Sequence, residues 1–247
     1  MSDNPHERAD KAERVRSMFA AIARSYDLNN RLHSLGRDQA WRRRAVNLAE
    51  VHPTDHVLDV ACGTGDLTEA FARARAERVI GLDFTEPMLE IARRKAAREP
   101  SPDPLKAIAY RQGDAMDLPF DDASFDIVSI AFGIRNVSEP ERALTEFFRV
   151  LRPGGRLIVL EFSEPKNRMI RALNRFYCHQ IMPRTASWIA RDRSGAYRYL
   201  PRSVETFLTR EAMTERMQRA GFREIAQHPM TFGVCVCYRG IVPRPAA

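Results

Sequence analysis

The most constraining feature of the chain is an apolar run, a glycine turn and a helix start that follow one another in Val57–Thr68. The apolar run predicts a buried strand, and Gly63 and Gly65 predict a tight turn after it. Asp83 closes a second apolar run further along the chain. Glycines let a ligand approach the backbone closely, a helix start directs amide N–H groups at it, and an acid on the next strand can accept hydrogen bonds from a ribose. The segment therefore predicts a site for a nucleoside-containing ligand.

Apolar runs and helix-like patterns alternate through the first part of the chain. Strands are expected at residues 56–61, 78–83, 107–112, 125–132 and 155–162. Helices are expected at residues 66–75, 86–98 and 139–151. This alternation favours a parallel sheet with helices on both faces, and the nearly continuous apolar character of the later runs agrees with strands covered on both sides. Pro153–Gly155 predicts a helix stop and a turn into the fifth strand.

The alternation breaks after residue 163. Apolar side chains between 164 and 203 recur at helical spacing with arginines between them, which predicts an amphipathic helical insertion. A helix at 210–220 and strands at 222–231 and 233–242 follow. The turn between these two strands is so short that they must pair antiparallel. A mostly parallel, Rossmann-like seven-stranded sheet that ends in an antiparallel hairpin resembles the α/β fold of class I S-adenosylmethionine methyltransferases.

These patterns divide the chain into four predicted parts. They are an N-terminal helical lid at 1–50, a cofactor-binding core at 51–163, a basic amphipathic insertion at 164–209, and a last helix and hairpin at 210–247 that complete the sheet. Within the first part, an apolar stripe runs from Val15 to Ile22 and is interrupted by Tyr26–Asn30. We expect one or two helices here that pack on the sheet and also cover the cofactor and the substrate.

Basic residues concentrate in the insertion. The chain carries a net charge of +7, and nine basic residues lie between 166 and 202 against one acid, Asp192. Such a cluster favours an anionic partner, phospholipid headgroups or nucleic acid, although a merely solvated basic face has the same composition. No apolar run is long enough to cross a bilayer, the N-terminus has no secretory apolar segment, and the four cysteines lack zinc-site spacing. We therefore expect a cytoplasmic chain without a metal site.

Three acids come at successive ends of the predicted parallel strands. Asp59 precedes the glycine turn and is placed to reach a cofactor amine or a bridging water, and Asp83 is placed for a ribose. Asp114 follows the third strand, where its carboxylate could accept from an adenine amino group while the Ala115 N–H meets a ring nitrogen. The alternative for each is an ordinary turn or cap acid. Thr68 stands where a third fingerprint glycine would lie, which disfavours a nicotinamide dinucleotide.

Three further segments carry a resemblance to a known family, and the first two are far more specific than the third, which contains a Pro-Gly-Gly turn common to many methyltransferases. They are Tyr26–Asn30, Phe132–Val137 and Arg149–Leu157. Together with the turn, they resemble the C-methyltransferases of quinone biosynthesis, the demethylmenaquinone and 2-polyprenyl-6-methoxy-benzoquinol methyltransferases. The likeness covers nearly the whole chain and departs at Ala131, where some members carry a serine.

The resemblance implies S-adenosylmethionine as the methyl donor, with contacts from Thr64, Asp83, Asp114 and Ala115. The whole predicted cofactor site consists of Asp59, Gly63, Thr64, Gly65, Asp83, Asp114 and Ala115. The resemblance also implies a polyprenyl quinol as the acceptor. We expect C-methylation of demethylmenaquinol in menaquinone biosynthesis, with the equivalent benzoquinol of ubiquinone biosynthesis as the alternative.

Methylation of a quinol carbon requires electron density at that carbon. Loss of a ring hydroxyl proton supplies it, so a base or a cation that stabilises the phenolate should line the pocket. Arg135 and Asn136 follow the fourth predicted strand, where Arg135 can stabilise the phenolate and Asn136 can orient a ring oxygen. A structural salt bridge is the alternative for Arg135, and Tyr26, Tyr199 and Asp192 are weaker candidates for proton handling.

Two other functions remain to be weighed. A nucleic-acid methyltransferase is disfavoured because Phe132–Arg135 stands where some such enzymes carry an Asn-Pro-Pro-Tyr loop. A cofactor-binding module without catalysis is disfavoured because Thr64, Asp83 and Arg135 are all present. The basic amphipathic insertion instead predicts peripheral association with the anionic inner face of a membrane, where a polyprenyl quinol resides. The sequence leaves a homodimer open.

Overall fold

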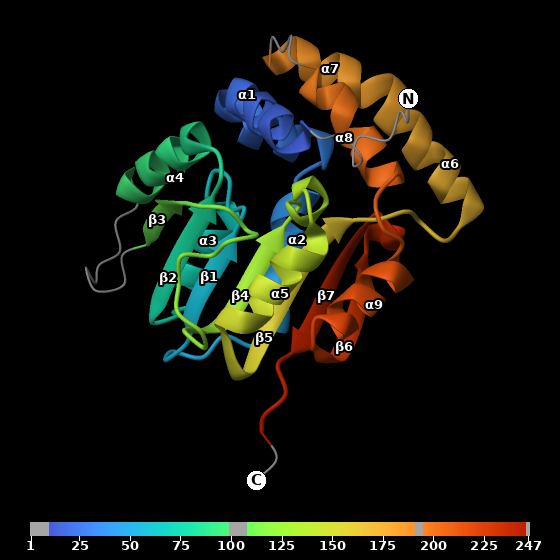
Figure 1. Ribbon diagram of the computed structural model, residues 1–247. Coiled ribbons are helices and arrows are strands. Elements are labelled where there is room, and N and C mark those ends of the chain that lie inside the picture. Colours follow the sequence, from blue (N-terminus) through green and yellow to red (C-terminus); the bar gives the residue numbers. More distant parts are fainter. Residues whose placement is uncertain (1–9, 99–107, 191–194, 246–247) are drawn as a thin grey trace.

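The computed structural model describes residues 10–98, 108–190 and 195–245 of the 247-residue chain. Its strands form one seven-stranded sheet in the order β3-β2-β1-β4-β5-β7-β6 (Figure 1). They are β1 (His56–Val60), β2 (Arg78–Asp83), β3 (Ala109–Gln112), β4 (Phe125–Ala131), β5 (Leu151–Phe162), β6 (Arg223–Met230) and β7 (Cys235–Ile241). Neighbouring strands are parallel except that β7 is antiparallel to both β5 and β6. The predicted sheet with its antiparallel C-terminal hairpin is confirmed.

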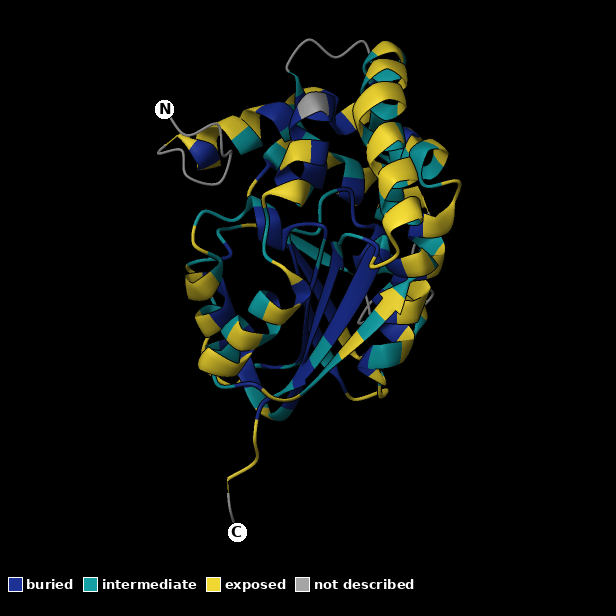
Figure 2. Cartoon of the chain, turned by 90° about the vertical axis from the view of Figure 1, so that its right-hand side faces the viewer, coloured by how far each residue is buried: buried dark blue, intermediate teal, exposed yellow. Residues whose placement is uncertain are grey.

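Helices cover both faces of the sheet and one of its ends (Figure 1). They are α1 (Lys11–His33), α2 (Arg37–Ala49), α3 (Asp66–Arg73), α4 (Glu86–Arg98), α5 (Pro140–Val150), α6 (Arg168–Phe176), α7 (Met182–Ala190), α8 (Ala196–Glu205) and α9 (Arg210–Arg219). Buried side chains of α5 and α9 pack in one core cluster, and those of α2 and α3 pack in another on the opposite face. Figure 2 shows the central strands buried and the outer sides of the helices exposed, while residues of the edge strands β3 and β6 are intermediate or exposed.

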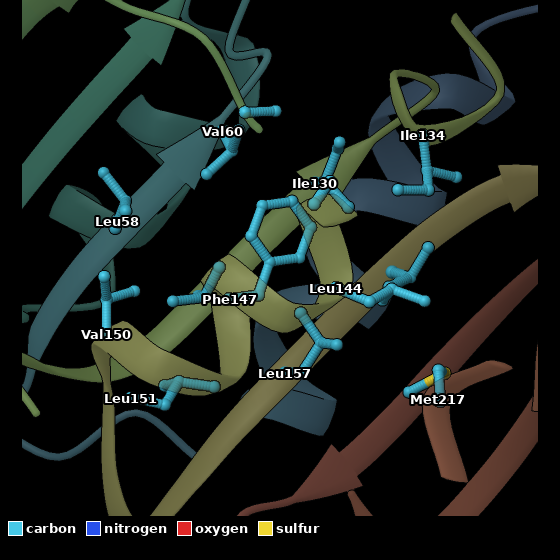
Figure 3. Packing of buried hydrophobic residues seen from close by; sticks show 14 of the residues in the cluster. Leu58, Val60, Ile130, Ile134, Leu144, Phe147, Val150, Leu151, Leu157 and Met217 are labelled. Atoms are coloured by element: carbon cyan, nitrogen blue, oxygen red, sulfur yellow. The ribbon is translucent and has the colours of Figure 1, made fainter. Parts of the chain in front are cut away.

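The spacing of apolar residues in α5 explains its position. Ala143, Leu144, Phe147 and Val150 recur at helical spacing and are all buried. They form one stripe that faces the sheet, which is how an amphipathic helix gains most of its stability. Phe147 lies in the middle of this cluster, close to Ile130 of β4 (Figure 3). The core therefore lies under the strands whose carboxyl ends carry the predicted site.

A cap lies above the carboxyl ends of the parallel strands. Met18 and Ile22 of α1 pack against Ala186 of α7 and against Tyr197 and Tyr199 of α8. The predicted lid and the predicted insertion thus share one small core. The second helix of the predicted lid, α2, does not belong to this cap core. Its buried face packs on the sheet.

The N-terminal part forms two helices, in agreement with the expectation of one or two, and α1 runs unbroken through Tyr26–Asn30. The chain turns at residues 34–36, where Leu35 and Gly36 have positive φ. One local feature differs from the expectations. The Pro153–Gly155 segment lies inside β5 rather than before it, and the β4–β5 register shifts between Phe125 and Ile127. The segment therefore forms a strand irregularity, with Gly154 at φ 83°. Residues 1–9 of the lid, residue 107 and Asp192 with its two flanking arginines lie outside the described residues.

Candidate active site

A first cavity opens at the carboxyl ends of the central strands. It encloses about 830 Å³ of empty space, counted with its open mouth. Val15, Phe19 and Tyr26 of α1 line its cap side. On the sheet side it is lined by predicted cofactor and catalytic residues, namely Gly63, Asp83, Asp114, Ala115 and Asn136. The structure therefore brings loops after β1, β2, β3 and β4 around one cavity.

Asp83 ends β2 with its carboxylate at the cavity wall. One oxygen accepts a hydrogen bond from the Gly63 N–H at 2.8 Å, and the other accepts from the Thr85 N–H at 2.8 Å. Burial raises the pKa of Asp83, and these two N–H donors oppose that rise. The Thr85 side chain and the Phe84 backbone oppose the rise as well. A carboxylate at this wall of the cavity can accept from a ribose hydroxyl. This geometry fits a ribose.

The glycine turn is shaped by backbone conformation and by close packing. Gly63 and Gly65 have φ of 56° and 87°, a region that side chains disfavour. A Cβ at Gly63 would meet open space, whereas one at Gly65 would lie 2.4 Å from the Tyr110 hydroxyl. Gly63 thus leaves room on the cavity side, and Gly65 allows the turn to pack on β3. Only Gly63 of the two lines the cavity.

Thr64 contacts helix α1 of the cap and is not among the residues that line the first cavity. Its buried hydroxyl donates to Asp27 of α1 at 2.5 Å. Lys95 of α4 donates to the other Asp27 oxygen at 3.1 Å and to Asp66 at 2.5 Å. Arg31 of α1 also pairs with Asp66. The start of α3 is thereby connected to α1 and α4.

Asp59 is placed away from the cavity. Its carboxylate accepts hydrogen bonds from the Thr68 hydroxyl at 2.6 Å and the Ser129 hydroxyl at 2.7 Å inside the protein. Burial raises its pKa to about 6. We expected Asp59 to contact a cofactor amine or a bridging water. In the structure its side chain points toward α3 and β4 instead, because successive side chains of a strand point to opposite faces of the sheet. Asp59 instead connects β1, α3 and β4.

Asp114 and Ala115 occupy the loop after β3. The Asp114 carboxylate accepts from the Met116 N–H at 2.9 Å and lines the cavity. Ala115 is buried and lines it next to Asp114. The loop presents a carboxylate with spare acceptor capacity, as an adenine amino group requires.

A second cavity adjoins the first. It encloses about 1190 Å³ of empty space, again counted with its mouth, and Tyr26 and Phe132 line both cavities. Its walls come from α1, α2, the short turn at Ile134–Asn136, the π-helical segment Tyr177–Ile181 and α8. A ligand in the second cavity would therefore reach one in the first beside Tyr26 and Phe132.

Arg135 and Asn136 lie on opposite sides of this boundary. Arg135 lines the second cavity and donates to Glu161 at 2.5 Å and to the Phe132 carbonyl at 2.8 Å. Asn136 lines the first cavity and accepts from the Tyr199 hydroxyl at 3.1 Å. The salt bridge that was the structural alternative for Arg135 is present, and both of its side chains are buried.

Two hydrogen-bond partners of the candidate residues were not predicted from the sequence: Glu161, which pairs with Arg135, and Ser129, which donates to Asp59. Glu161 sits in the apolar run of β5, and Ser129 sits in that of β4. A charged or hydroxyl side chain in a buried strand must find a partner, since burying it alone is costly. That signal was visible in the sequence, but the partner's identity depends on which strands are neighbours.

The comparisons with known proteins agree with this geometry. Residues 7–242 match the ubiE/COQ5 methyltransferase family. The chain belongs to this family. A demethylmenaquinone methyltransferase of Thermus thermophilus is 45% identical over 92% of this chain and 100% of its own length. One of Deinococcus radiodurans is 42% identical over 95% of both chains. A ubiquinone/menaquinone biosynthesis C-methyltransferase of Geobacter sulfurreducens is 41% identical over 94% of this chain and 89% of its own.

Solved structures of other methyltransferases share the fold. A methyltransferase in complex with the Haloferax volcanii Trm112 activator matches with a TM-score of 0.65 and 19% identity, over 92% of this chain and 98% of that one. A S-adenosylmethionine-dependent methyltransferase of Thermotoga maritima matches with a TM-score of 0.59 and 22% identity, over 91% and 99%. The predicted class I fold and the predicted methyltransferase activity are confirmed, and S-adenosylmethionine as cofactor agrees with both.

Proposed function

We propose that this family member methylates a ring carbon of a polyprenyl quinol, and that its substrate is demethylmenaquinol. The observation that carries the proposal is the pair of adjoining cavities, which meet at Tyr26 and Phe132. One has the acceptor groups that a nucleoside needs, and the other has largely aromatic and aliphatic walls suited to a quinol ring. Catalysis between them requires alignment of the two reactants and exclusion of water.

In the first cavity, Gly63, Asp83, Asp114 and Ala115 would hold S-adenosylmethionine. When bound, this cofactor supplies an electrophilic methyl group. Asp83 would accept from a ribose hydroxyl at the cavity wall, and Gly63 leaves space beside it. Thr64 and Gly65 shape the turn, and the α1 residues above it exclude water.

At the boundary, Arg135 and Asn136 would act on the acceptor ring. Glu161 and the Phe132 carbonyl hold the Arg135 guanidinium at the wall of the second cavity. A phenolate forming there would accept hydrogen bonds from guanidinium N–H groups, while Glu161 balances part of the charge of Arg135. The ring carbon beside the phenolate then gains the electron density that attack on a methyl group needs. Asn136 is oriented by Tyr199 on the cofactor side.

The choice of demethylmenaquinol rests on the relatives. The two that bear the name demethylmenaquinone methyltransferase are 42% and 45% identical to this chain, and the one of Geobacter sulfurreducens named for both quinones is 41% identical. The test is a methyl-transfer assay with purified protein, labelled S-adenosylmethionine and either demethylmenaquinol or 2-polyprenyl-6-methoxy-1,4-benzoquinol. We expect faster transfer to the naphthoquinol ring. Exclusive transfer to the benzoquinol would reverse the assignment, and transfer to neither would contradict the function.

We also propose that α6 brings the enzyme to an anionic membrane surface. Met169, Leu173 and Phe176 lie at helical spacing and are 70%, 64% and 60% exposed, with Arg168 and Arg171 on the same helix. An apolar stripe flanked by arginines is the pattern of an interfacial helix. Across the described ranges, no helix is long and apolar enough to cross a membrane. Co-flotation with vesicles of anionic lipid tests this proposal, and binding that is absent or insensitive to salt would contradict it. The homodimer and the lack of a nucleic-acid partner stay predictions.

A further inference from the structure

The second cavity has one exposed end, which lies away from the first cavity. Among the described residues that line it, only Arg175, His179 and Glu205 are exposed, whereas Tyr26 and Phe132 at the first cavity are not. The three exposed residues come from α6, the π-helical segment and α8. They lie next to one another, because Glu205 pairs with His179 at 2.8 Å and with Arg175 at 3.5 Å. These three side chains therefore mark the mouth of the second cavity.

Helix α8 runs along the cavity between its two ends. Near the start of the helix, Tyr199 donates to Asn136, which lines the first cavity. The last residue of the helix is Glu205, at the mouth. Between them, Leu200 and Val204 lie one turn apart on the same face and line the second cavity. With a rise of 1.5 Å per residue, this aliphatic wall covers about 9 Å from Tyr199 to Glu205.

The position of the acceptor ring fixes where its tail begins. The reacting carbon must lie beside the methyl group of the cofactor, so the ring belongs where the two cavities meet, at Tyr26 and Phe132. In a demethylmenaquinol, the prenyl chain is attached to the carbon next to the one that is methylated. The first cavity is occupied by the cofactor, so the tail must run in the other direction, toward the mouth of the second cavity.

We propose that the second cavity is a port for the prenyl tail, which runs along Leu200 and Val204 and leaves between Arg175, His179 and Glu205. The inference rests on the proposed function and makes the tail part of substrate recognition. Burial of prenyl carbons against aliphatic side chains contributes affinity in proportion to the apolar area removed from water. An acceptor ring without a tail lacks this contribution.

The ion pairs at the mouth allow a tail to pass. Arg175 donates to Glu164 at 2.7 and 3.0 Å and also pairs with Glu205. Exposed ion pairs contribute little to stability, so their separation by a tail costs little. Phe176 follows Arg175 in the chain and belongs to the exposed apolar residues of α6. A tail that leaves the port therefore meets the surface that we propose contacts the membrane.

A series of tail lengths tests the port with the whole enzyme. The acceptors are 1,4-naphthalenediol and its 2-prenyl derivatives of increasing length, kept reduced under anaerobic conditions in one detergent. Methyl transfer from labelled S-adenosylmethionine gives kcat/KM for each acceptor. We expect kcat/KM to rise at least about tenfold over the first prenyl units and then to level off, once the tail projects beyond the mouth.

The series separates failure of the port from failure of the proposed function. Transfer to every acceptor with the same kcat/KM overturns the port and leaves the proposed function in place. A rise that continues with every added unit also overturns the port, because it reflects partition into detergent. Transfer to none of the acceptors contradicts the proposed function and the inference together.

A substitution tests the path of the tail. Val204→Trp places a bulky side chain in the aliphatic wall and should lower the ratio of kcat/KM for the tailed acceptor to kcat/KM for the tailless one about tenfold. Arg202→Trp is the matched control, because Arg202 is an exposed residue of α8 that lines neither cavity. Its ratio should equal that of the unsubstituted protein. Melting temperatures show whether both variants are folded.

Each result with the variants bears on the port. A lower ratio in Val204→Trp but not in Arg202→Trp supports it. An unchanged ratio in folded Val204→Trp protein overturns it, as does an equal fall in both variants. If Val204→Trp does not fold, the series of tail lengths with the unsubstituted protein decides.

Discussion

The environment of each carboxylate in this protein depends on the face of the sheet to which its strand directs the side chain. Asp83 and Asp59 both lie in central parallel strands, but Asp83 faces the first cavity and Asp59 is enclosed between Thr68 and Ser129. Strand alternation and strand order decide this difference. A spacing argument alone places both acids at the same edge.

Asp83→Asn is expected to weaken cofactor binding. The amide retains only one acceptor oxygen, so it cannot replace both carboxylate interactions with a ribose. Hydrogen bonds to a charged group contribute about 1.5 to 3 kcal/mol, which predicts affinity for S-adenosylhomocysteine lower by about 10- to 100-fold. Titration calorimetry measures it. Glu90→Gln, at an exposed position of α4, is the control. An unchanged affinity in folded Asp83→Asn protein would remove Asp83 from the site.

The raised pKa of Asp59 predicts how the free energy of unfolding changes with pH. Its pKa is raised to about 6 in the folded protein, so the folded state binds this proton more tightly than the unfolded chain does. The stabilisation is present at low pH and is lost as pH rises through the folded pKa. Between pH 5 and pH 7 we expect the unsubstituted protein to lose about 1 kcal/mol of unfolding free energy relative to Asp59→Asn. Urea denaturation of both proteins at the two pH values measures the difference, and parallel pH dependences would refute the assignment.

At the scale of elements, the cap is built from helices far apart in the chain. Helix α1 packs with α7 and α8, and its inner face lines both cavities. Helix α6 has no buried residue, although its hydrophobic side chains repeat at helical spacing. Such a helix is expected to place its apolar stripe against something other than its own core.

Leu173→Ser and Phe176→Ser should weaken vesicle binding without destabilising the fold. Both side chains are exposed, so their removal leaves no cavity in the protein. Burial of such a side chain contributes about 1.5 to 3 kcal/mol, so each change should lower the partition coefficient at least tenfold. Sedimentation with anionic vesicles measures it, and Leu173→Met, which keeps an apolar side chain, is the control. Unaltered partitioning of both serine variants would exclude α6 as the contact.

At the scale of the whole molecule, the first cavity joins sheet and cap. Loops of the sheet form one wall, and α1 forms the other. The Thr64–Asp27 hydrogen bond and the ion pairs of Lys95 connect the same parts. A ligand that contacts both walls would therefore connect the cap to the sheet.

Cofactor binding should accordingly stabilise the whole chain. At 100 times its dissociation constant, S-adenosylhomocysteine is expected to add about 2.7 kcal/mol of unfolding free energy and raise the melting temperature by about 5 to 10 °C. Differential scanning calorimetry measures the shift. The Asp83→Asn variant at the same concentrations should show a smaller one. A transition in which only part of the molecule responds would show that cap and sheet unfold separately.

Most of the scaffold was predictable from the pattern of residues. The parallel strands, the terminal hairpin and the loops around the first cavity follow from apolar runs, glycine turns and a short final connection, all of which act locally. Pro153–Gly155 was predicted as a turn before the fifth strand, but it lies inside β5. A proline and two glycines can also form an irregularity inside a paired strand. Helix α1 continues through Tyr26–Asn30, where the apolar stripe is interrupted, because polar residues of a helix can find a distant partner, as Asn29 does in Tyr197.

The sequence by itself determined the class of fold, the methyltransferase family and the loops that line the first cavity, because those depend on residues near one another in the chain. Only the tertiary structure decided that Asp59 is internal, that Arg135 is paired with Glu161, and that a second cavity adjoins the first. It also placed Asn29 and His33 of α1 among the residues that line that second cavity. The physical reason is that hydrogen-bond partners and cavity walls come from segments far apart in sequence, and their distance is set by packing.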